Sequence, residues 1–379
     1  MNAAAAGTTE SKRERLISLD MMRGLAVIGM ILVNEMAGME SEGKVFPTLL
    51  HSSWAGLTLA DVVFPMFLMM AGVSIPLSLG AGGRECPVDK EESKRILGRS
   101  LRLILLGFIL SNLWWFADQS ATSWRLFGVL QRIGLVYGAC AFLFLLCSPR
   151  IRLALIAIIL ILYWPLTLLP SLDGLPNDIW MRGHNFVGSV DRVLLGAGNH
   201  NHVRGPEGYD PEGLLGTLPS IAHGLIGVAV GEFLARRRDG DLGRLALAGA
   251  TMLVAGVLWG LVFPVIKDIW SSPFVLVTCG ISILVLALLR WIFDGHSVEG
   301  ARKAAAIIIL PFGVNAIAAY VLHDVAGSML GWDVLQQPYQ MTRAALGDRV
   351  AALIPVSLFL LFIWLCMYYL WKKRWIIKI

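Results

Sequence analysis

The feature that most constrains this chain is a series of long apolar segments that recurs along nearly its whole length. An α-helix needs about 20 predominantly apolar residues to cross a bilayer, and only helices and closed barrels satisfy their backbone groups in lipid. The sequence therefore predicts an all-α, polytopic integral membrane bundle of about ten transmembrane helices. The ten expected spans are residues 17–36, 57–80, 99–117, 126–147, 151–170, 213–235, 245–266, 272–292, 304–325 and 350–371.

The composition agrees with a membrane protein. The chain of 379 residues is 56% hydrophobic and 16% charged, with a mean hydropathy of +0.67, whereas soluble domains have about 25% charged residues. Its five cysteines form no CxxC pair, so we expect neither a disulfide framework nor a metal site. The net charge of +5 is explained by membrane topology rather than by nucleic-acid binding.

The distribution of Lys and Arg predicts the orientation of the bundle, because cytoplasmic loops are enriched in these residues. With a cytoplasmic N-terminus, 22 of them fall in inner segments and 8 in outer segments. Both termini are then cytoplasmic. We expect a polar N-terminal tail over 1–16, without a signal peptide, and one transmembrane domain over 17–379. A long outer loop occupies 171–212, and a second outer segment, 326–349, is expected to hold a short interfacial helix around 330–340.

A polar motif lies where the chain enters the second expected span. His51 stands in LLHSSWAGLTLADVVFP, ten residues before Asp61. Imidazole titrates near neutral pH and is suited to general acid–base or nucleophilic catalysis. We expect Asp61 to fix the tautomer of His51, and Asn34 to orient it or to stabilise an oxyanion.

Other ionisable and amide side chains fall at membrane depth, where they are costly and usually functional. In the outer half of the bundle they predict a substrate-binding cluster; its members are Gln131, Arg132, Asp210, Glu212, Asn315 and His323. At the inner end, the nearest cations for the phosphates of a coenzyme are Arg23 and the basic segment that includes Arg99 and Arg102.

Simpler readings stay open for several of these residues. His51 alone in a loop would be an ordinary solvated side chain. Arg132 would serve only to join helices if it paired with Asp61 or Glu212. Asp210 and Glu212 flank Pro211, as at the start of a helix, where the helix dipole stabilises carboxylates.

Five segments resemble the family of transmembrane acetyltransferases typified by heparan-α-glucosaminide N-acetyltransferase. They are SLDMMRGLAVIGMILVNEMAG, LLHSSWAGLTLADVVFPMFLMMAGVSI, GVLQRIGLVY, YDPEGLLGTLPSIAHGLIGVAVG and FGVNAIAAYVLHD, and they occur in the family's order from about Ile17 to the C-terminus. The resemblance implies that acetyl-CoA is the cytoplasmic co-substrate and that His51 is the catalytic histidine. It also matches Asn34, Arg132, Asp210 and Glu212 to polar residues of the family's motifs.

The chain departs from this family in lacking a large N-terminal luminal domain and a leading span, and its loop 171–212 differs. The expected acceptor is therefore the amine or hydroxyl of an amino sugar or glycan rather than heparan sulfate, and the expected location is a bacterial inner (plasma) membrane. Whether the histidine carries the acetyl group or acts as a base stays open, as do a longer acyl donor and a homodimer. The alternatives are a transporter or flippase for a small molecule or lipid-linked sugar, and a non-enzymatic scaffold.

Overall fold

The computed structural model describes residues 16–40, 44–80, 89–116, 124–196, 200–236, 241–294 and 299–377. The expected polar tail, apart from its last residue, lies outside these ranges, as do the inner-loop residues Arg84, Arg237 and Arg238. The described residues form helices and no strand. The helices are α1 (Ile17–Met39), η1 (Pro47–Leu49), α2 (Leu59–Leu79), α3 (Lys90–Ser111), η2 (Leu113–Phe116), α4 (Val129–Leu146), α5 (Pro149–Thr167), α6 (Phe186–Leu195), α7 (Thr217–Ala235), α8 (Asp241–Trp259), α9 (Ser272–Phe293), α10 (Gly300–Val314), α11 (Ala316–Leu346) and α12 (Asp348–Lys372).

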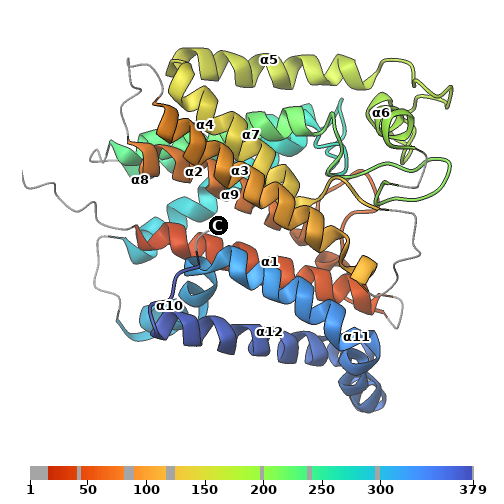
Figure 1. Cartoon of the computed structure of the whole chain (residues 1–379), viewed down its shortest axis with the longest axis vertical. Helices are drawn as coiled ribbons and strands as arrows, with labels where there is room; N and C mark the ends of the chain where they lie inside the picture. The colour runs from red at the N-terminus through yellow and green to blue at the C-terminus, as the bar shows by residue number, and fades with distance from the viewer. Residues whose placement is uncertain are drawn as a thin grey trace, which may run out of the picture.

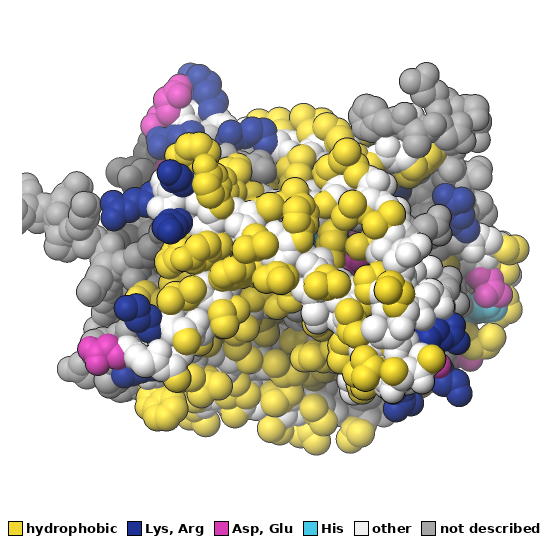
Figure 2. Space-filling model, turned by 90° about the horizontal axis from the view of Figure 1, so that it is seen from below, with side chains coloured by type: hydrophobic (Ala, Val, Ile, Leu, Met, Phe, Trp, Pro, Cys, Tyr) yellow, Lys and Arg dark blue, Asp and Glu magenta, His cyan; other side chains and the backbone are white. Residues whose placement is uncertain are grey.

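Eight helices of the described chain are long and apolar enough to cross a membrane: α1, α2, α4, α5, α7, α8, α9 and α12. The bent pair α10 and α11 makes a ninth span if the two are counted together. The remaining expected span, α3, begins nine residues earlier than predicted and carries a charged first half. Figure 2 shows a broad hydrophobic belt with Lys and Arg gathered at its two margins, as in an integral multi-pass membrane protein. The all-α membrane bundle is thus confirmed.

The expectation of one straight helix over 304–325 is wrong. The helix breaks at Asn315 (φ −117°, ψ 41°), and its two parts meet at 78°. Pro311 lies just before the break and removes a backbone hydrogen bond from the helix, which is a common cause of kinks. Beyond the break α11 runs to Leu346 through a second irregularity at Gly331 (φ 70°). The segment expected to be an interfacial helix is the later part of α11.

Close packing of α2 on α7 fixes the helix that carries Asp61. A Cβ atom at Gly72 would lie 2.2 Å from the carbonyl oxygen of Gly224, and one at Gly227 would lie 2.3 Å from that of Met69. Small residues at such contacts let two membrane helices approach through their backbones. This packing holds α2, which carries Asp61, in a fixed position against α7. The helix α7 in turn follows the Asp210–Glu212 segment in the chain.

The segment 171–212, expected to be a long outer loop, contains the amphipathic helix α6, which its sequence did not indicate. Asp191 of α6 is buried and accepts hydrogen bonds from the backbone N–H groups of Leu214 (3.0 Å) and Asp210 (3.3 Å). Burial raises the pKa of Asp191 to about 6, although these two hydrogen bonds act in the opposite direction. The helix α6 thereby holds in place the segment that contains Asp210 and Glu212.

The helices are arranged as a bundle with α5 along one edge and α12 along the opposite edge (Figure 1). α1 ends, and α2 begins, at one end of the bundle, near η1. We call this the His51 end. The opposite end, where α1 begins, contains a cavity, and we call it the cavity end.

Candidate active site

The centre of the His51 end is a hydrogen-bonded imidazole–carboxylate pair. His51 Nδ1 lies 2.8 Å from Asp61 Oδ1. The other oxygen, Oδ2, accepts hydrogen bonds from the backbone N–H groups of Ser52 (3.1 Å) and Thr58 (3.0 Å) and from the Thr58 hydroxyl (3.0 Å). Such a set of donors suits an ionised carboxylate, which has no proton to give. Nδ1 of His51 therefore carries a hydrogen, which in the neutral ring leaves the lone pair on Nε2.

The exposure of the two partners differs in a way that suits catalysis. The side chain of Asp61 is fully buried, whereas that of His51 is 39% exposed. The carboxylate is thus shielded and fixed, while the ring remains accessible to a reactant. The predicted relation between His51 and Asp61 is present in the structure.

The loop that carries His51 is held by three contacts with residues distant in the chain. Gly56 has φ 127°, a left-handed conformation that favours glycine, and its N–H group donates to the carbonyl of Val265 (2.9 Å). Ala55 forms an isolated β-bridge with Ile266. The indole Nε1 of Trp54 donates to the carbonyl of Ile179 (2.9 Å). The segment is therefore a rigid support for His51 rather than a free loop.

The predicted partner Asn34 lies near the end of α1, and its side chain is exposed. None of the hydrogen bonds among the described residues joins it to His51 or Asp61. Its predicted catalytic role therefore stays a prediction, and the structure supplies Thr58 and Ser52 as the direct supports of the pair.

Asp210 and Glu212 share one cation, Arg125. Arg125 Nε and Nη2 donate to the two oxygens of Asp210, each at 2.8 Å, and Nη2 also lies 2.5 Å from Glu212 Oε2. Burial alone would raise the pKa of Glu212, but the nearby cations, led by Arg125, lower it to about 2. Glu212 is thus held ionised, and both acids belong to one buried hydrogen-bond network with Arg125. No local sequence pattern pointed to Arg125, which is 85 residues from Asp210.

Arg132 makes neither of the ion pairs considered for it. It is buried, donates from Nη2 to the carbonyl of Gly213 (3.2 Å) and stacks over the ring of Trp270 at 4.9 Å. Its Nε and Nη1 atoms have no hydrogen-bond partner among the described residues. Arg132 thus braces the Asp210–Glu212 segment and keeps donor capacity inside the site.

Gln131 serves helix packing in this structure. Its Nε2 donates to the Ser111 hydroxyl (3.3 Å) and the Leu126 carbonyl (3.2 Å), and the side chain packs against Gly107 and Gly128. It is buried between α3 and α4, so a role in substrate binding stays a prediction.

His323 belongs to a second acid–base group at the His51 end. Its Nε2 lies 3.2 Å from Glu35 Oε1, and its Nδ1 lies 3.1 Å from Asp324 Oδ1. His323 and Glu35 are both buried. The prediction placed His323 at this end of the bundle, and Glu35 on α1 is its partner.

Asn315 is not part of this group, which corrects its expected position in the outer half of the ninth span. The adjacent Gly313 packs against the backbone of Asp20 and Gly24, in the first turns of α1. The side chain of Asn315 bonds to residues 375 and 377, beyond the end of α12. The break between α10 and α11 places Asn315 at the cavity end.

The cavity end contains a cavity of about 850 Å³, within the usual range for small-molecule sites. The predicted cations Arg23, Arg99 and Arg102 all line it, together with Arg95. Arg95, Arg99 and Arg102 follow one another at intervals of four and three residues, so they share one face of α3. This spacing is the signal by which Arg95 could have been found. The other polar residues in the lining are Asp20, Ser74, Ser78, Glu92 and Tyr137, and the rest is largely apolar.

The contacts of these arginines leave positive charge available to a ligand. Arg99 stacks over Tyr137 at 4.6 Å, and its Nε has no hydrogen-bond partner among the described residues. Arg95 and Arg102 each donate from Nε to a carbonyl of α3. Arg23 is engaged with Asp20 (3.1 Å) and Ser74. The face of α3 therefore offers three cations to one cavity.

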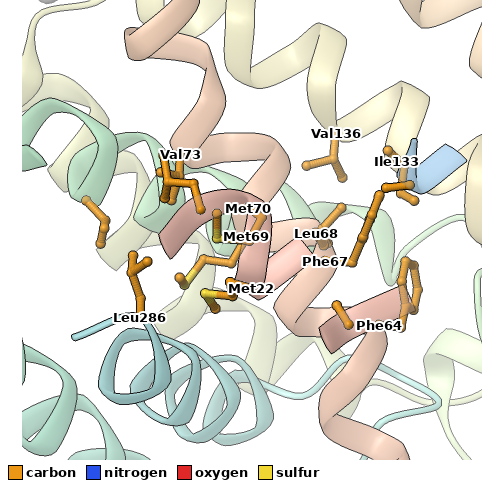
Figure 3. Close-up of a cluster of buried hydrophobic side chains, with 14 of the residues drawn as sticks. Met22, Phe64, Phe67, Leu68, Met69, Met70, Val73, Ile133, Val136 and Leu286 are labelled. Atoms are coloured by element: carbon orange, nitrogen blue, oxygen red, sulfur yellow. The ribbon is translucent and has the colours of Figure 1, made fainter. Parts of the chain in front are cut away.

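The two ends are connected along α2. Phe67 lines the cavity and follows Asp61 by six residues, about 9 Å along a helix axis. Figure 3 shows Phe64 and Phe67 in the buried apolar cluster that lies between, with Met22, Leu68 and Ile133. The cavity thus approaches the His51–Asp61 pair from the opposite end of the bundle.

The comparisons with known proteins agree with this arrangement. Residues 15–195 match the family described as heparan-alpha-glucosaminide N-acetyltransferase, catalytic. The protein of that name from Homo sapiens is 31% identical over 369 residues, which cover 82% of this chain and 53% of the human protein. The protein of the same name from Mus musculus is 29% identical over 373 residues; this match covers 84% of this chain and 54% of the mouse protein.

The chain spans about half the length of these relatives. The matched region begins at the start of α1 and ends with α6, so it contains His51, Asp61, Arg125 and the α3 arginines. The resemblance seen in the sequence is thereby confirmed: the chain is a membrane protein similar over most of its length to the heparan-alpha-glucosaminide N-acetyltransferases, and residues 15–195 match the catalytic region of that family.

Proposed function

We propose that this protein is a transmembrane acetyltransferase that moves an acetyl group from cytoplasmic acetyl-CoA to the amine or hydroxyl of an extracytoplasmic amino sugar or glycan. The observation that carries the proposal is the hydrogen-bonded His51–Asp61 pair at the start of α2, the helix whose later residues line a cavity with several arginines. The relatives supply the reaction class through their names.

The cavity suits acetyl-CoA in both charge and polarity. Arg95, Arg99 and Arg102 offer guanidinium groups, which bind phosphates in a bidentate manner, and the remaining lining offers apolar surface for the pantetheine arm. The excess of Lys and Arg in the segments at this end supports a cytoplasmic location for it. The phosphates would bind at α3, and the acetyl thioester would extend along α2 toward Phe67.

The thioester is already activated, so the protein has to supply a base or nucleophile and to exclude water. Nε2 of His51 has the free lone pair. In direct transfer it takes the proton of the acceptor amine while the amine nitrogen attacks the carbonyl carbon; the C–S bond breaks, and the departing CoA thiolate receives that proton from the imidazolium. In a two-step reaction Nε2 itself attacks the carbonyl carbon, the C–S bond breaks and the CoA thiolate leaves; the acceptor amine then attacks the acetyl-imidazole, the bond from Nε2 to the acetyl carbon breaks, and the proton lost by the amine ends on the released thiolate. General base catalysis contributes roughly 10²- to 10⁴-fold.

Asp61 acts in either route by holding Nδ1–H, so that the lone pair stays on Nε2 and the imidazolium is stabilised. Phe64 and Phe67 lie between the cavity and the pair, and their side chains would have to move to admit the thioester. Their apolar rings would also keep water away from it.

Asp210 and Glu212 are the proposed contacts for the amino sugar. Arg125 occupies part of their capacity, because it already binds three of their four oxygens. The fourth oxygen of the two acids, together with the unpartnered nitrogens of Arg132, would be available to the hydroxyl and amine groups of a sugar.

The test is to incubate purified wild-type protein with labelled acetyl-CoA and glucosamine and to look for labelled N-acetylglucosamine. Formation of this product supports the proposal. Labelled protein without product would retain the donor and exclude glucosamine as acceptor. Failure of CoA to bind or react would contradict the proposal and favour a transporter.

A further inference from the structure

At the break between α10 and α11, the side chain of Asn315 makes hydrogen bonds to a distant part of the chain. The side chain of Asn315 makes no helix-capping hydrogen bond to α10 or α11. Instead its Nδ2 donates to the carbonyl of Trp375 (3.0 Å), and its Oδ1 accepts from the N–H of Ile377 (2.9 Å). Because a carbonyl only accepts and an N–H only donates, the two bonds also fix the orientation of the amide. Asn315 thus holds residues 375–377, here called the tail segment, through their backbone.

A specific turn brings the tail segment back to the bundle. Arg374 has φ 58°, its N–H donates to the Trp371 carbonyl (3.0 Å), and the N–H of Trp375 donates to the Leu370 carbonyl (2.9 Å). This is the hydrogen-bond pattern of a Schellman motif, in which the left-handed position is usually glycine. The helix α12 therefore ends in a defined reversal, after which the chain rises toward α1 (Figure 1).

The tail segment forms part of the cavity lining. Ile376 and Ile377 line the same cavity as the arginines of α3, together with Val314 and Ile317, which lie on either side of Asn315 in the chain. Asn315 itself is buried, whereas the two isoleucines are 44% and 49% exposed. The clamp is therefore covered by protein, while the apolar side chains that it presents are left open to the cavity, as expected for a wall that a ligand covers.

From this arrangement we infer that the tail segment, held by Asn315, is one wall of the donor site, and that Asn315 is a positioning residue for acetyl-CoA. The inference rests on the proposed function and adds a binding determinant to it. The division of the site follows from its chemistry: the arginines of α3 face the phosphates, and the isoleucines supply an apolar surface for the pantetheine arm. Asn315 acts only through the tail segment.

Loss of the clamp should weaken donor binding without affecting the chemistry at His51, because the two lie at opposite ends of the bundle. The test variant is Asn315→Leu, which keeps the volume of the side chain and removes both hydrogen bonds. A second variant, deletion of residues 375–379, leaves the α10–α11 break intact and removes the wall itself. Arg374→Gly is the matched control, since glycine accepts the left-handed turn and leaves the tail segment seated.

The measurements are the KM of acetyl-CoA, kcat, the KM of the acceptor and the Kd of CoA by calorimetry, all in detergent-purified protein. We expect Asn315→Leu and the deletion to raise the KM of acetyl-CoA and the Kd of CoA about tenfold, which is about 1.4 kcal/mol. The kcat value and the acceptor KM should stay at the wild-type level, and Arg374→Gly should match wild type throughout.

Two results would overturn the inference: an unchanged Kd of CoA in the deletion variant, or a fall in kcat of the Asn315 variant with unchanged donor KM. These outcomes are distinct from failure of the proposed function, which would appear as wild-type protein that neither binds CoA nor transfers an acetyl group.

Discussion

The two ends of this bundle differ in how their charged side chains are paired. At the His51 end the carboxylates of Asp61, Asp210 and Glu212 each have an imidazole or guanidinium partner. At the cavity end, Arg95, Arg99 and Arg102 have no carboxylate within ion-pair distance among the described residues, although all three line one cavity. Charges that are already paired position groups for chemistry, whereas an unpaired cluster in a cavity favours an anionic ligand.

This contrast assigns different experiments to the two ends. Changes at the His51 end should alter rate or stability, because they disturb groups that the protein itself has fixed. Changes at the cavity end should alter the apparent affinity for the donor. The predictions below run from the largest expected effect to the smallest.

Asp61→Asn should nearly abolish transfer. The amide would turn its oxygen toward the N–H groups of Ser52 and Thr58, so its NH₂ group would face His51 Nδ1. The imidazole proton would then sit on Nε2, and the reactive lone pair would be lost. A tautomer error of this kind costs roughly 10⁴ in kcat in serine proteases, and we expect about 10³- to 10⁴-fold here at unchanged donor KM. A variant with a wild-type kcat would contradict the assignment of the chemical step to the His51 end.

Glu212→Gln should destabilise the protein at neutral pH. The pKa of Glu212 is lowered in the folded state, from 4.5 to about 2, so its contribution to stability is present above about pH 4.5 and is lost as the pH falls toward 2. Thermal unfolding in detergent at several pH values should show a lower melting temperature for the variant at pH 7 and convergence with wild type at acid pH.

The matched control for this experiment is Glu207→Gln. Glu207 pairs with His184 but is largely exposed, and exposed pairs contribute little to stability. Equal losses in the two variants would show that the Arg125 network is no stronger than a surface ion pair.

Arg99→Ala should raise the KM of acetyl-CoA by roughly 10- to 100-fold, because it removes a charge-assisted contact worth about 1.5–3 kcal/mol. The kcat value and the acceptor KM should change little. Arg150→Ala removes an exposed cation at the start of α5, outside the cavity, and should leave the donor KM unchanged. An equal effect of both substitutions would mean that only the general positive charge of this end matters.

Trp54→Phe should have the smallest effect. It removes the hydrogen bond to the Ile179 carbonyl and keeps most of the packing against Tyr209, so about 1 kcal/mol of stability should be lost. Activity at 25 °C should remain close to wild type. A loss of activity comparable with that of Asp61→Asn would show that the loop, rather than the hydrogen bond to Asp61, controls His51.

The properties that could be predicted from the sequence are those determined locally. The apolar segments predicted the spans, and the short separation of His51 and Asp61 predicted that the two lie close together, His51 before the second span and Asp61 in its first turns. The basic segment that includes Arg99 and Arg102 predicted cations at the inner end of the bundle. Each depends on residues that are close together in the chain.

The contacts that the sequence did not reveal join distant residues. Arg125 meets Asp210 and Glu212 across 85 and 87 residues, and Asn315 meets the tail segment across 60 and 62. Asn315 was also placed at the wrong end, because hydropathy cannot distinguish a straight span from two helices that meet at a break. Such pairings depend on how the helices pack, which no local pattern records.

The most direct test of the central claim uses proteoliposomes with labelled acetyl-CoA on the side of the cavity end and glucosamine on the other. Wild-type protein and His51→Ala are compared at equal insertion and equal CoA affinity. The account predicts labelled N-acetylglucosamine in the glucosamine compartment with wild type, and no product with the variant despite normal CoA binding. Transfer by His51→Ala at the wild-type rate would contradict it.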